Sequence, residues 1–205
     1  MIIMKKGINK ILKNKAVAIF LTVVLLILFT LFVMKMVDNI YPGGDTVLIK
    51  TSMGDITIEL NRENAPITVE NFLSYVDSSF YDDLVFHRVM SGFMIQGGGF
   101  EISGEQKKTD DPIKLESDNS LKNSKYTIAM ARTNVPDSAT SQFFINAADN
   151  LQLDYSVGNP GYAVFGNVID GEEIVDEINV VKTGSRGHLN DWPVEDVIIY
   201  SIERI

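Results

Sequence analysis

One uncharged apolar segment near the start of the chain constrains what the remaining residues can be. It runs from Ala16 to Met34 and contains 19 residues without a charge. A helix rises about 1.5 Å per residue, so a helix of this length just spans a hydrocarbon core of about 30 Å. Five lysines precede the segment, whereas Lys35 alone follows it closely. Since positively charged flanks stay in the cytoplasm, we expect a cytoplasmic N-terminus and an extracytoplasmic chain from about Asp38 onward.

Two other interpretations of this segment are open. A cleaved signal peptide has an apolar region of roughly 7–15 residues and a small-x-small cleavage site. Here Met34-Lys35-Met36-Val37-Asp38 follows instead. A buried core helix is the other alternative, although the length and the basic flank argue against it. We therefore predict an uncleaved signal anchor and a single-pass membrane protein.

The two sides of the segment carry opposite charge. Residues 1–37 contain six lysines and no acidic residue, so 12 basic residues face all 27 acidic ones beyond them, a net charge of -15. Nucleic-acid phosphates are held by clustered Lys and Arg, and no basic run follows Lys15, which excludes a nucleic-acid partner. The chain has no Cys, which excludes thiol catalysis, zinc fingers and iron–sulfur clusters.

These features predict four parts. The Pro42-Gly43-Gly44 stretch stops regular structure, and the residues that follow suffice for one domain with its own core. The expected parts are a basic cytoplasmic tail (1–15), a transmembrane signal anchor (16–34), a linker (35–45) and a folded domain (46–205).

The last part has the pattern of a mainly β domain. Thr46–Thr51 and Asp55–Leu60 alternate apolar and polar residues around Ser52-Met53-Gly54, which predicts a hairpin. A helix is expected from Pro66, with Val69, Phe72, Leu73 and Val76 on its buried face. A second short helix is expected after the acidic stretch Asp170–Glu173.

Further apolar runs bring the expected number of strands to about eight, which favours an antiparallel barrel or sandwich. These runs are Val85–Met90, Phe93–Gln96, Thr127–Ala131, Gln142–Ala147, Tyr162–Ile169 and Val194–Ile202. Glu101–Lys125 and Asn150–Gly161 are longer than ordinary loops, and such loops are often functional.

Common catalytic constellations are missing from the sequence. His87 and His188 are the only histidines, and no G-x-S-x-G motif frames a nucleophilic serine. Two histidines without nearby acids at ligand spacing make a poor metal site, and Gly97-Gly98-Gly99 lacks the Lys-Ser/Thr of a phosphate loop. Standard hydrolase, metalloenzyme and NTPase functions are therefore excluded, and we expect no cofactor.

The remaining unusual feature is an arginine among apolar residues in Phe86–Phe100. Strand alternation predicts that Phe86, Arg88 and Met90 share one face. An arginine in apolar surroundings is costly unless it acts on a ligand, but it can also extend its charged end to solvent over its own stem. This motif alone leaves both interpretations open.

Three further segments, taken with this one, point to a family. The F-H-R-V-x-x-G-F-M-x-Q-G-G block, the stretch Thr127–Thr133, the S-A-T-S-Q-F-F-I-N block and Gly161–Gly166 together resemble the cyclophilins, in particular bacterial ones. Cyclophilins are peptidyl-prolyl cis–trans isomerases. The resemblance covers roughly residues 46 to 204 and implies an eight-stranded antiparallel barrel closed by a helix at each end.

The resemblance also implies a set of site residues. Arg88 matches the catalytic arginine, and Gln96 and Gln142 match polar residues that line the site. Ala131 and Arg132 match positions whose backbone holds the substrate. The remaining matches are the proline pocket, Phe93, Met94, Phe144 and Leu153, together with Tyr162, where many members have His, and His87 beside the arginine.

Several details remain alternatives at this point. His87 is either a structural histidine or a proton donor, and Gln142 could instead satisfy a buried backbone group. Gln152 stands where the family has Trp or Phe, which puts one wall of the pocket and tight cyclosporin binding in doubt. We expect a monomeric isomerase acting on proline-containing polypeptides outside the cytoplasm. A proline-peptide binding module or holdase with little turnover, or an anchored scaffold, are the alternatives.

Overall fold

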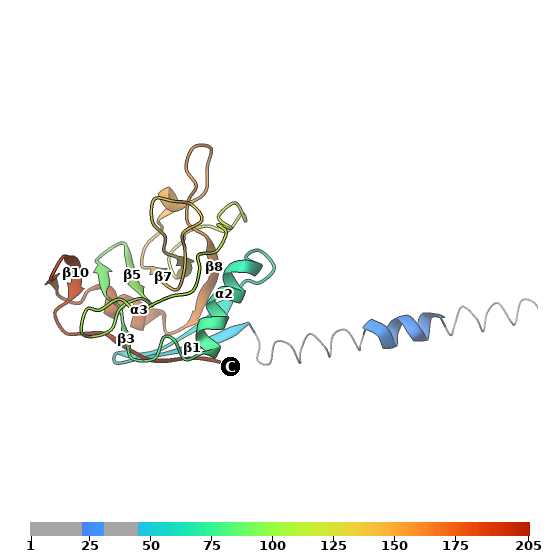
Figure 1. The fold of residues 1–205 in the computed structure, drawn as a ribbon, viewed down its shortest axis with the longest axis horizontal. Coiled ribbons are helices and arrows are strands. Elements are labelled where there is room, and N and C mark those ends of the chain that lie inside the picture. Colours follow the sequence, from blue (N-terminus) through green and yellow to red (C-terminus); the bar gives the residue numbers. More distant parts are fainter. Residues whose placement is uncertain (1–21, 31–44) are drawn as a thin grey trace, which may run out of the picture. The chain divides into compact units, whose positions relative to one another are not determined.

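The computed structural model describes residues 22–30 and 45–205 (Figure 1). The chain divides into two units, Met1–Gly43 and Gly44–Ile205. Residues 22–30 are helical, and no helix in the described ranges is long and apolar enough to cross a membrane. The predicted tail (1–15) lies outside the described residues, as do residues 35–44 of the linker and most of the predicted span.

The second unit is built on one antiparallel sheet. Its strand order is β3-β11-β1-β2-β8-β6-β7-β5-β4. The strands are β1 (Thr46–Thr51), β2 (Gly54–Leu60), β3 (Leu84–Val85), β4 (Arg88–Met90), β5 (Met94–Gly97), β6 (Thr127–Met130), β7 (Phe143–Asn146), β8 (Val164–Asp170) and β11 (Ile198–Arg204). The predicted hairpin is β1 and β2, paired from Thr46↔Glu59 to Thr51↔Gly54.

The sheet is curled, and its two edge strands follow one another directly in the sequence. The edge strands β3 and β4 are consecutive in sequence, separated by Phe86 and His87 alone. β3 pairs with β11, whereas β4 pairs with β5. The prediction of a mainly β fold is confirmed. The expected closed ring of eight hydrogen-bonded strands is not, because the ladder of described strands runs through nine strands from one edge to the other.

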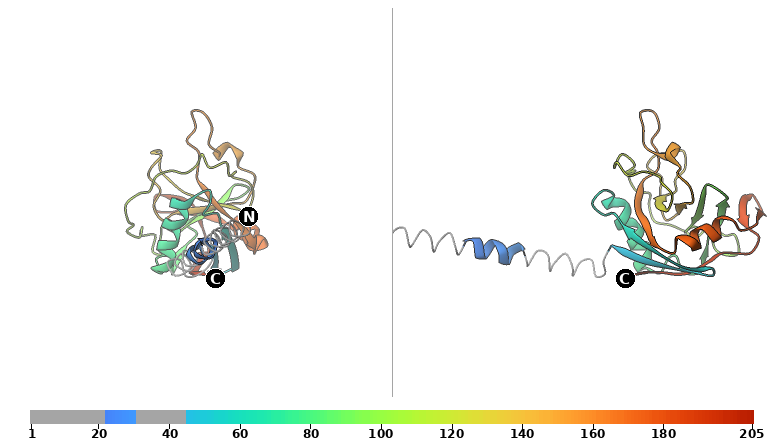
Figure 2. Two further views of the ribbon diagram at one scale, coloured as in Figure 1. Left: turned by 90° about the vertical axis from the view of Figure 1, so that its right-hand side faces the viewer. Right: turned by 180° about the vertical axis from the view of Figure 1, so that it is seen from behind.

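Two helices pack on this sheet as predicted (Figure 2). Helix α2 (Pro66–Asp77) begins at a proline, whose fixed φ suits the first helical position, and buries the four predicted apolar residues. It packs against β11. Helix α3 (Glu172–Asn179) has acidic residues in its first turn, where they favour a helix N-terminus, and packs against β2, β4 and β5.

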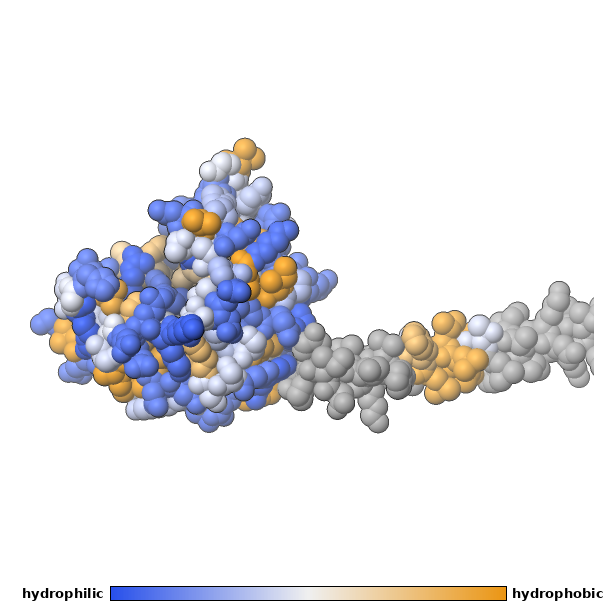
Figure 3. All heavy atoms as spheres, viewed as in Figure 1, coloured by the Kyte–Doolittle hydropathy of each residue, from blue (hydrophilic) through white to orange (hydrophobic). Residues whose placement is uncertain are grey.

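Strand alternation divides the apolar residues into an inner and an outer cluster. Ile95 on β5 and Phe143 and Ile145 on β7 are fully buried in the main core, which also holds Phe72 of α2. Their neighbours Met94 and Phe144 belong to a separate cluster with Ala129 and Val164. One stretch of sequence therefore builds the core on one side and an apolar surface on the other. Elsewhere the visible face of this unit is mainly hydrophilic (Figure 3).

A second hairpin was not predicted. Strands β9 (Thr183–Arg186) and β10 (Leu189–Pro193) form a separate two-stranded sheet, and β10 lies against β4. Its anchor is Trp192, which is 2% exposed and packs with Val85 and Phe100. The short 3-10 helix η1 (Leu151–Leu153) was also missed. Both elements contribute to the surroundings of the site.

Candidate active site: an apolar pocket beside one arginine

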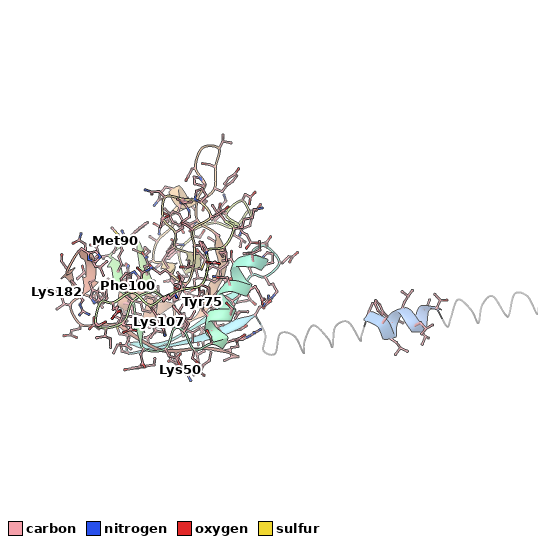
Figure 4. The ribbon with its side chains drawn as sticks, viewed as in Figure 1. Lys50, Tyr75, Met90, Phe100, Lys107 and Lys182 are labelled. Carbon is pink, nitrogen blue, oxygen red and sulfur yellow. The ribbon has the colours of Figure 1, made fainter. Side chains whose placement is uncertain are left out.

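A cavity of about 160 Å³ opens on the outer face of β4, β5 and β7. All of its lining residues were predicted from the sequence. They are Arg88, Phe93, Met94, Gln96, Ala131, Arg132, Phe144, Leu153 and Tyr162. Figure 4 places Met90, the neighbour of this cavity on β4, on the side of the domain that carries β5 and β10.

Apolar side chains form the floor and walls of the cavity. Met94 and Phe144 are 2% and 4% exposed, and Phe93, Leu153 and Tyr162 pack around them. The Tyr162 ring meets Phe144 edge-on, with centroids 5.6 Å apart. Phe93 and Met94 both reach the cavity although they are adjacent, because Phe93 lies in the turn before β5. The pocket is therefore sized and lined for a small apolar ring.

The guanidinium of Arg88 lies at the rim of this pocket. On β4, Arg88 is paired in register with Gln96 of β5. Its Nη1 donates to Gln96 Oε1 at 3.3 Å and its Nη2 contacts Met90 Sδ at 2.9 Å. Its Nε lies 3.7 Å from Asp191 Oδ2, and the Arg88 side chain is 41% exposed. The charge thus keeps contact with solvent while the side chain is held beside the apolar floor.

Gln142 supports this arrangement from outside the pocket lining. Gln96 Nε2 donates to Gln142 Oε1 at 2.9 Å, so a chain of amides continues from Arg88. A Cβ atom on Gly99 would come within 2.5 Å of Gln142 Cγ. Gly99 therefore leaves room for the Gln142 side chain, a role that the sequence did not indicate. Gln142 orients Gln96, whereas we had expected it to line the site.

Arg132 uses its side chain to brace one wall. Its Nε donates to Gly161 O at 2.9 Å and its Nη1 to Thr133 O at 2.8 Å. The guanidinium also lies 4.5 Å from the centre of the Tyr162 ring, a favourable cation–π geometry. Ala131 N–H donates to Gln142 O at 2.9 Å, which ties this wall to β7. Gln152, by contrast, is exposed and lies outside the cavity lining.

His87 lies behind the site and not in it. Its side chain is 4% exposed and packs against Phe100, with ring centroids 4.5 Å apart, and against Trp192. Within the described residues its Nδ1 has no hydrogen-bond partner. Burial lowers the pKa of His87 to about 4, and the charge of Arg88 acts in the same direction. His87 is therefore neutral at pH 7 and has a structural position.

The prediction that Phe86 and Arg88 lie on the same face of one strand is wrong. Phe86 is fully buried in the main core together with Val89, whereas Arg88 lines the outer pocket. The chain bends at Phe86 and His87 as it passes from one sheet edge to the other. This bend breaks the two-residue alternation that a straight strand would have.

The site as a whole combines an apolar pocket, the guanidinium of Arg88 at its rim and the amide of Gln96, while the Arg132 guanidinium braces one wall. It lacks a nucleophile with a base beside it, so it suits a reaction in which a bound chain is twisted without bond cleavage. A proline ring fits such a pocket, and an X-Pro peptide bond is the tertiary amide whose rotation is slow. The geometry is thus compatible with rotation about a prolyl bond.

Comparison with known proteins identifies the family. Residues 46–204 match the cyclophilin type peptidyl-prolyl cis-trans isomerase/CLD family, and the chain belongs to it. Peptidyl-prolyl cis-trans isomerase cyp18 of Streptomyces antibioticus is 57% identical over 160 residues, which cover 76% of this chain and 96% of that protein. Peptidyl-prolyl cis-trans isomerase B of Escherichia coli K12 is 52% identical over 159 residues, 76% of this chain and 97% of that protein. The chain is therefore a cyclophilin-type peptidyl-prolyl cis-trans isomerase.

A solved structure supports the fold assignment. A cyclophilin type isomerase of Cryptosporidium parvum, crystallised in the presence of the dipeptide Ala-Pro, aligns with a TM-score of 0.63 and 29% identity. The alignment covers 78% of this chain and 98% of that one.

Proposed function

We propose that Arg88 carries the isomerase reaction, with the substrate proline ring in the pocket of Phe93, Met94, Phe144 and Leu153. The observation that supports this is the guanidinium held at the pocket rim by Gln96 and Met90. A ring in the pocket would bring its nitrogen toward the charged donor, while the preceding carbonyl stays free to swing. The presence of the dipeptide Ala-Pro with the Cryptosporidium protein is consistent with a proline-containing ligand.

The reaction needs differential binding and no acid–base step. Conjugation of the prolyl nitrogen with the carbonyl raises a rotation barrier of about 18–20 kcal/mol. Twisting frees the nitrogen lone pair, so a donor aimed at this nitrogen stabilises the twisted state more than either planar one. A hydrogen bond from a charged group contributes about 1.5–3 kcal/mol, and the dry pocket and the fixed orientation must supply the remaining acceleration.

The catalytic role is tested by replacing the arginine. Arg88→Ala should lower kcat/KM for a short X-Pro peptide on the order of 10- to 100-fold, because one charged hydrogen bond is lost. Lys50→Ala is the matched control, since it removes a cation whose partner is the exposed Glu203, apart from Met90 and the site (Figure 4). Equal inactivity of wild type and Arg88→Ala, with proline peptides still bound, would favour the binding-module alternative.

We further propose that the enzyme is anchored in the membrane by residues 16–34 and works on polypeptides that fold outside the cytoplasm. The support is the uncharged segment after five lysines and the acidic, Cys-free domain that follows it. A protease added to intact cells should digest or release residues 45–205. Complete protection in intact cells, with digestion after lysis, would contradict this orientation.

Two structural proposals accompany this function. The nine lining residues of one chain form the pocket, and we propose that the enzyme works as a monomer. We also interpret Leu84–Met90 as a single bent strand that belongs to both sheet edges. On that view the nine-strand order becomes a closed ring of eight, a rigid support for the pocket.

A further inference from the structure

We propose that Asp191 is a positioning residue for the isomerase reaction, whose carboxylate fixes the orientation of the Arg88 guanidinium. The inference rests on the proposed catalytic role of Arg88. It concerns the unpredicted β9–β10 hairpin, which lies against β4 and brings Asp191 Oδ2 to 3.7 Å from Arg88 Nε. None of the pocket-lining segments includes this hairpin.

Each nitrogen of Arg88 has a different partner. Nε faces Asp191, Nη1 donates to Gln96, and Nη2 contacts Met90 Sδ. A guanidinium has five N–H groups in one plane. The contacts with Gln96 and Met90 use one hydrogen on each Nη, whereas the approach of Asp191 to Nε at 3.7 Å is an ion pair and is longer than a hydrogen bond. In the described part of the chain, one N–H on each Nη is thus left for a substrate. A carboxylate beside Nε favours one plane of the group and hence one direction of these two donors.

The backbone at Asp191 indicates that its placement is imposed by the surrounding structure. Its φ is +61°, in the left-handed region that few residues other than Gly adopt. The strand pairing also shifts register between Leu189 and Trp192, so Asp191 lies in an irregular part of β10. Such conformations persist only where neighbouring contacts hold them, and they concentrate at functional sites. Asp is one of the residue types that tolerates this region best.

The contacts that hold Asp191 surround its neighbour Trp192. The indole is 2% exposed, and its Nε1 donates to Asp196 Oδ1 at 2.7 Å. Arg186 lies over the same ring at 4.5 Å and forms an ion pair with Asp196 at 3.0 Å. These contacts span both strands of the hairpin and the segment that follows it. The residue next to Asp191 is therefore fixed, which holds the Asp191 backbone at this place in the hairpin.

A role in charge neutralisation is the weaker interpretation. The Arg88 and Asp191 side chains are each 41% exposed, and ion pairs of this exposure are strongly screened by water. The guanidinium therefore keeps its positive charge for the substrate. The carboxylate instead reduces the number of orientations open to the Arg88 side chain. With fewer orientations, the Nη donors point at the prolyl nitrogen more often.

The test compares two aspartates with the same backbone conformation. Asp191→Asn removes the charge while keeping the size and the left-handed preference of the side chain, so the hairpin should fold. Asp83→Asn is the matched control, because Asp83 has the same φ of +61° and lies outside the pocket lining. Both substitutions are made in the full chain kept in mild detergent. Peptide isomerisation yields kcat and KM, and the emission of Trp192 reports hairpin integrity, since it is the chain's one tryptophan.

We expect Asp191→Asn to lower kcat about three- to tenfold, because misdirected donors lose transition-state contacts while the apolar pocket still binds proline. KM should stay within about twofold, and Asp83→Asn should match wild type. In an Arg88→Ala background, Asp191→Asn should cause no further loss, since residues that act through one another are not additive.

Three results would overturn the inference: an unchanged or higher kcat in Asp191→Asn with unaltered Trp192 emission, a change in KM alone, or a full additional loss in the Arg88→Ala background. If Arg88→Ala itself retained wild-type activity, the proposed function would fail as well. The two failures are therefore distinguishable.

Discussion

The buried histidine makes domain stability depend on pH in a window that we can state. His87 is 4% exposed and its pKa falls to about 4, below the ordinary value of 6.5. The unfolded chain therefore takes up this proton at a higher pH than the folded one. Protonation favours the unfolded state as pH drops from 6.5 toward 4, and the contribution vanishes above that window. One pKa unit corresponds to about 1.4 kcal/mol, so the full effect is on the order of 3 kcal/mol.

Replacing His87 by Gln should remove this pH dependence. Urea unfolding of residues 45–205 at pH 7.5, 6.0, 5.0 and 4.5 gives the unfolding free energy of each protein. This region suffices because the Streptomyces and Escherichia relatives consist almost wholly of it, 96% and 97%. At pH 7.5, the unfolding free energy of His87→Gln should be equal to that of wild type or lower. Between pH 7.5 and 4.5, this free energy should fall by about 2–3 kcal/mol less in His87→Gln than in wild type.

The comparison is internally controlled. Carboxylates titrate alike in both proteins, and the exposed His188 is present in both, so their effects cancel in the difference. Trp192 packs near the His87 ring, with centroids 6.1 Å apart, and its fluorescence follows the same transition. Parallel stability curves for the two proteins between pH 7.5 and 4.5 would refute the reasoning, because they would mean that burial does not disfavour the imidazolium.

Three further substitutions test other parts of the structure. Phe144→Ala should raise KM for an X-Pro peptide and lower the unfolding free energy by about 3–5 kcal/mol, because Phe144 is buried at 4% exposure in the pocket floor; peptide kinetics and urea melts measure both effects. Glu116→Ala should cost about 1–2 kcal/mol in a urea melt, since its carboxylate accepts from the Ile67 and Thr68 backbone N–H groups at the start of α2, whereas kcat should not change. Gly99→Ala should displace Gln142 and lower kcat severalfold with a smaller effect on the melting temperature, and equal kcat would show that the amide chain is dispensable.

Local patterns were sufficient to predict the elements whose partners lie nearby in the sequence. The β1–β2 hairpin and helix α2 have periodic apolar residues that face one core, and both lie where the sequence predicted them. The β9–β10 hairpin has the sequences TGSR and LNDWP, which lack such a period. It is fixed by Trp192 and Asp196, whose contacts are set by tertiary packing, so propensity could not reveal it.

The site shows the same limit. Composition and periodicity singled out Arg88 as an arginine in apolar surroundings, but the full lining depended on resemblance to a family, because it joins five separate stretches of chain. The predicted face of Phe86 was wrong, and the role of His87 stayed open, because both residues lie at a bend between two sheet edges. Asp191 carried no motif, since its contact with Arg88 arises from tertiary packing alone.

The position of β3 and β4 at the two edges of the sheet has a consequence for an isomerase that binds extended peptides. An extended polypeptide can add itself to any sheet edge with free backbone groups, which leads to aggregation. Here β3 is covered by the backbone of Phe100 and Glu101, and β10 lies along β4. A chain approaching these edges therefore meets Phe100 and Glu101 at β3 and the β9–β10 hairpin beside β4. Edges covered in this way are less open to strand addition than bare ones.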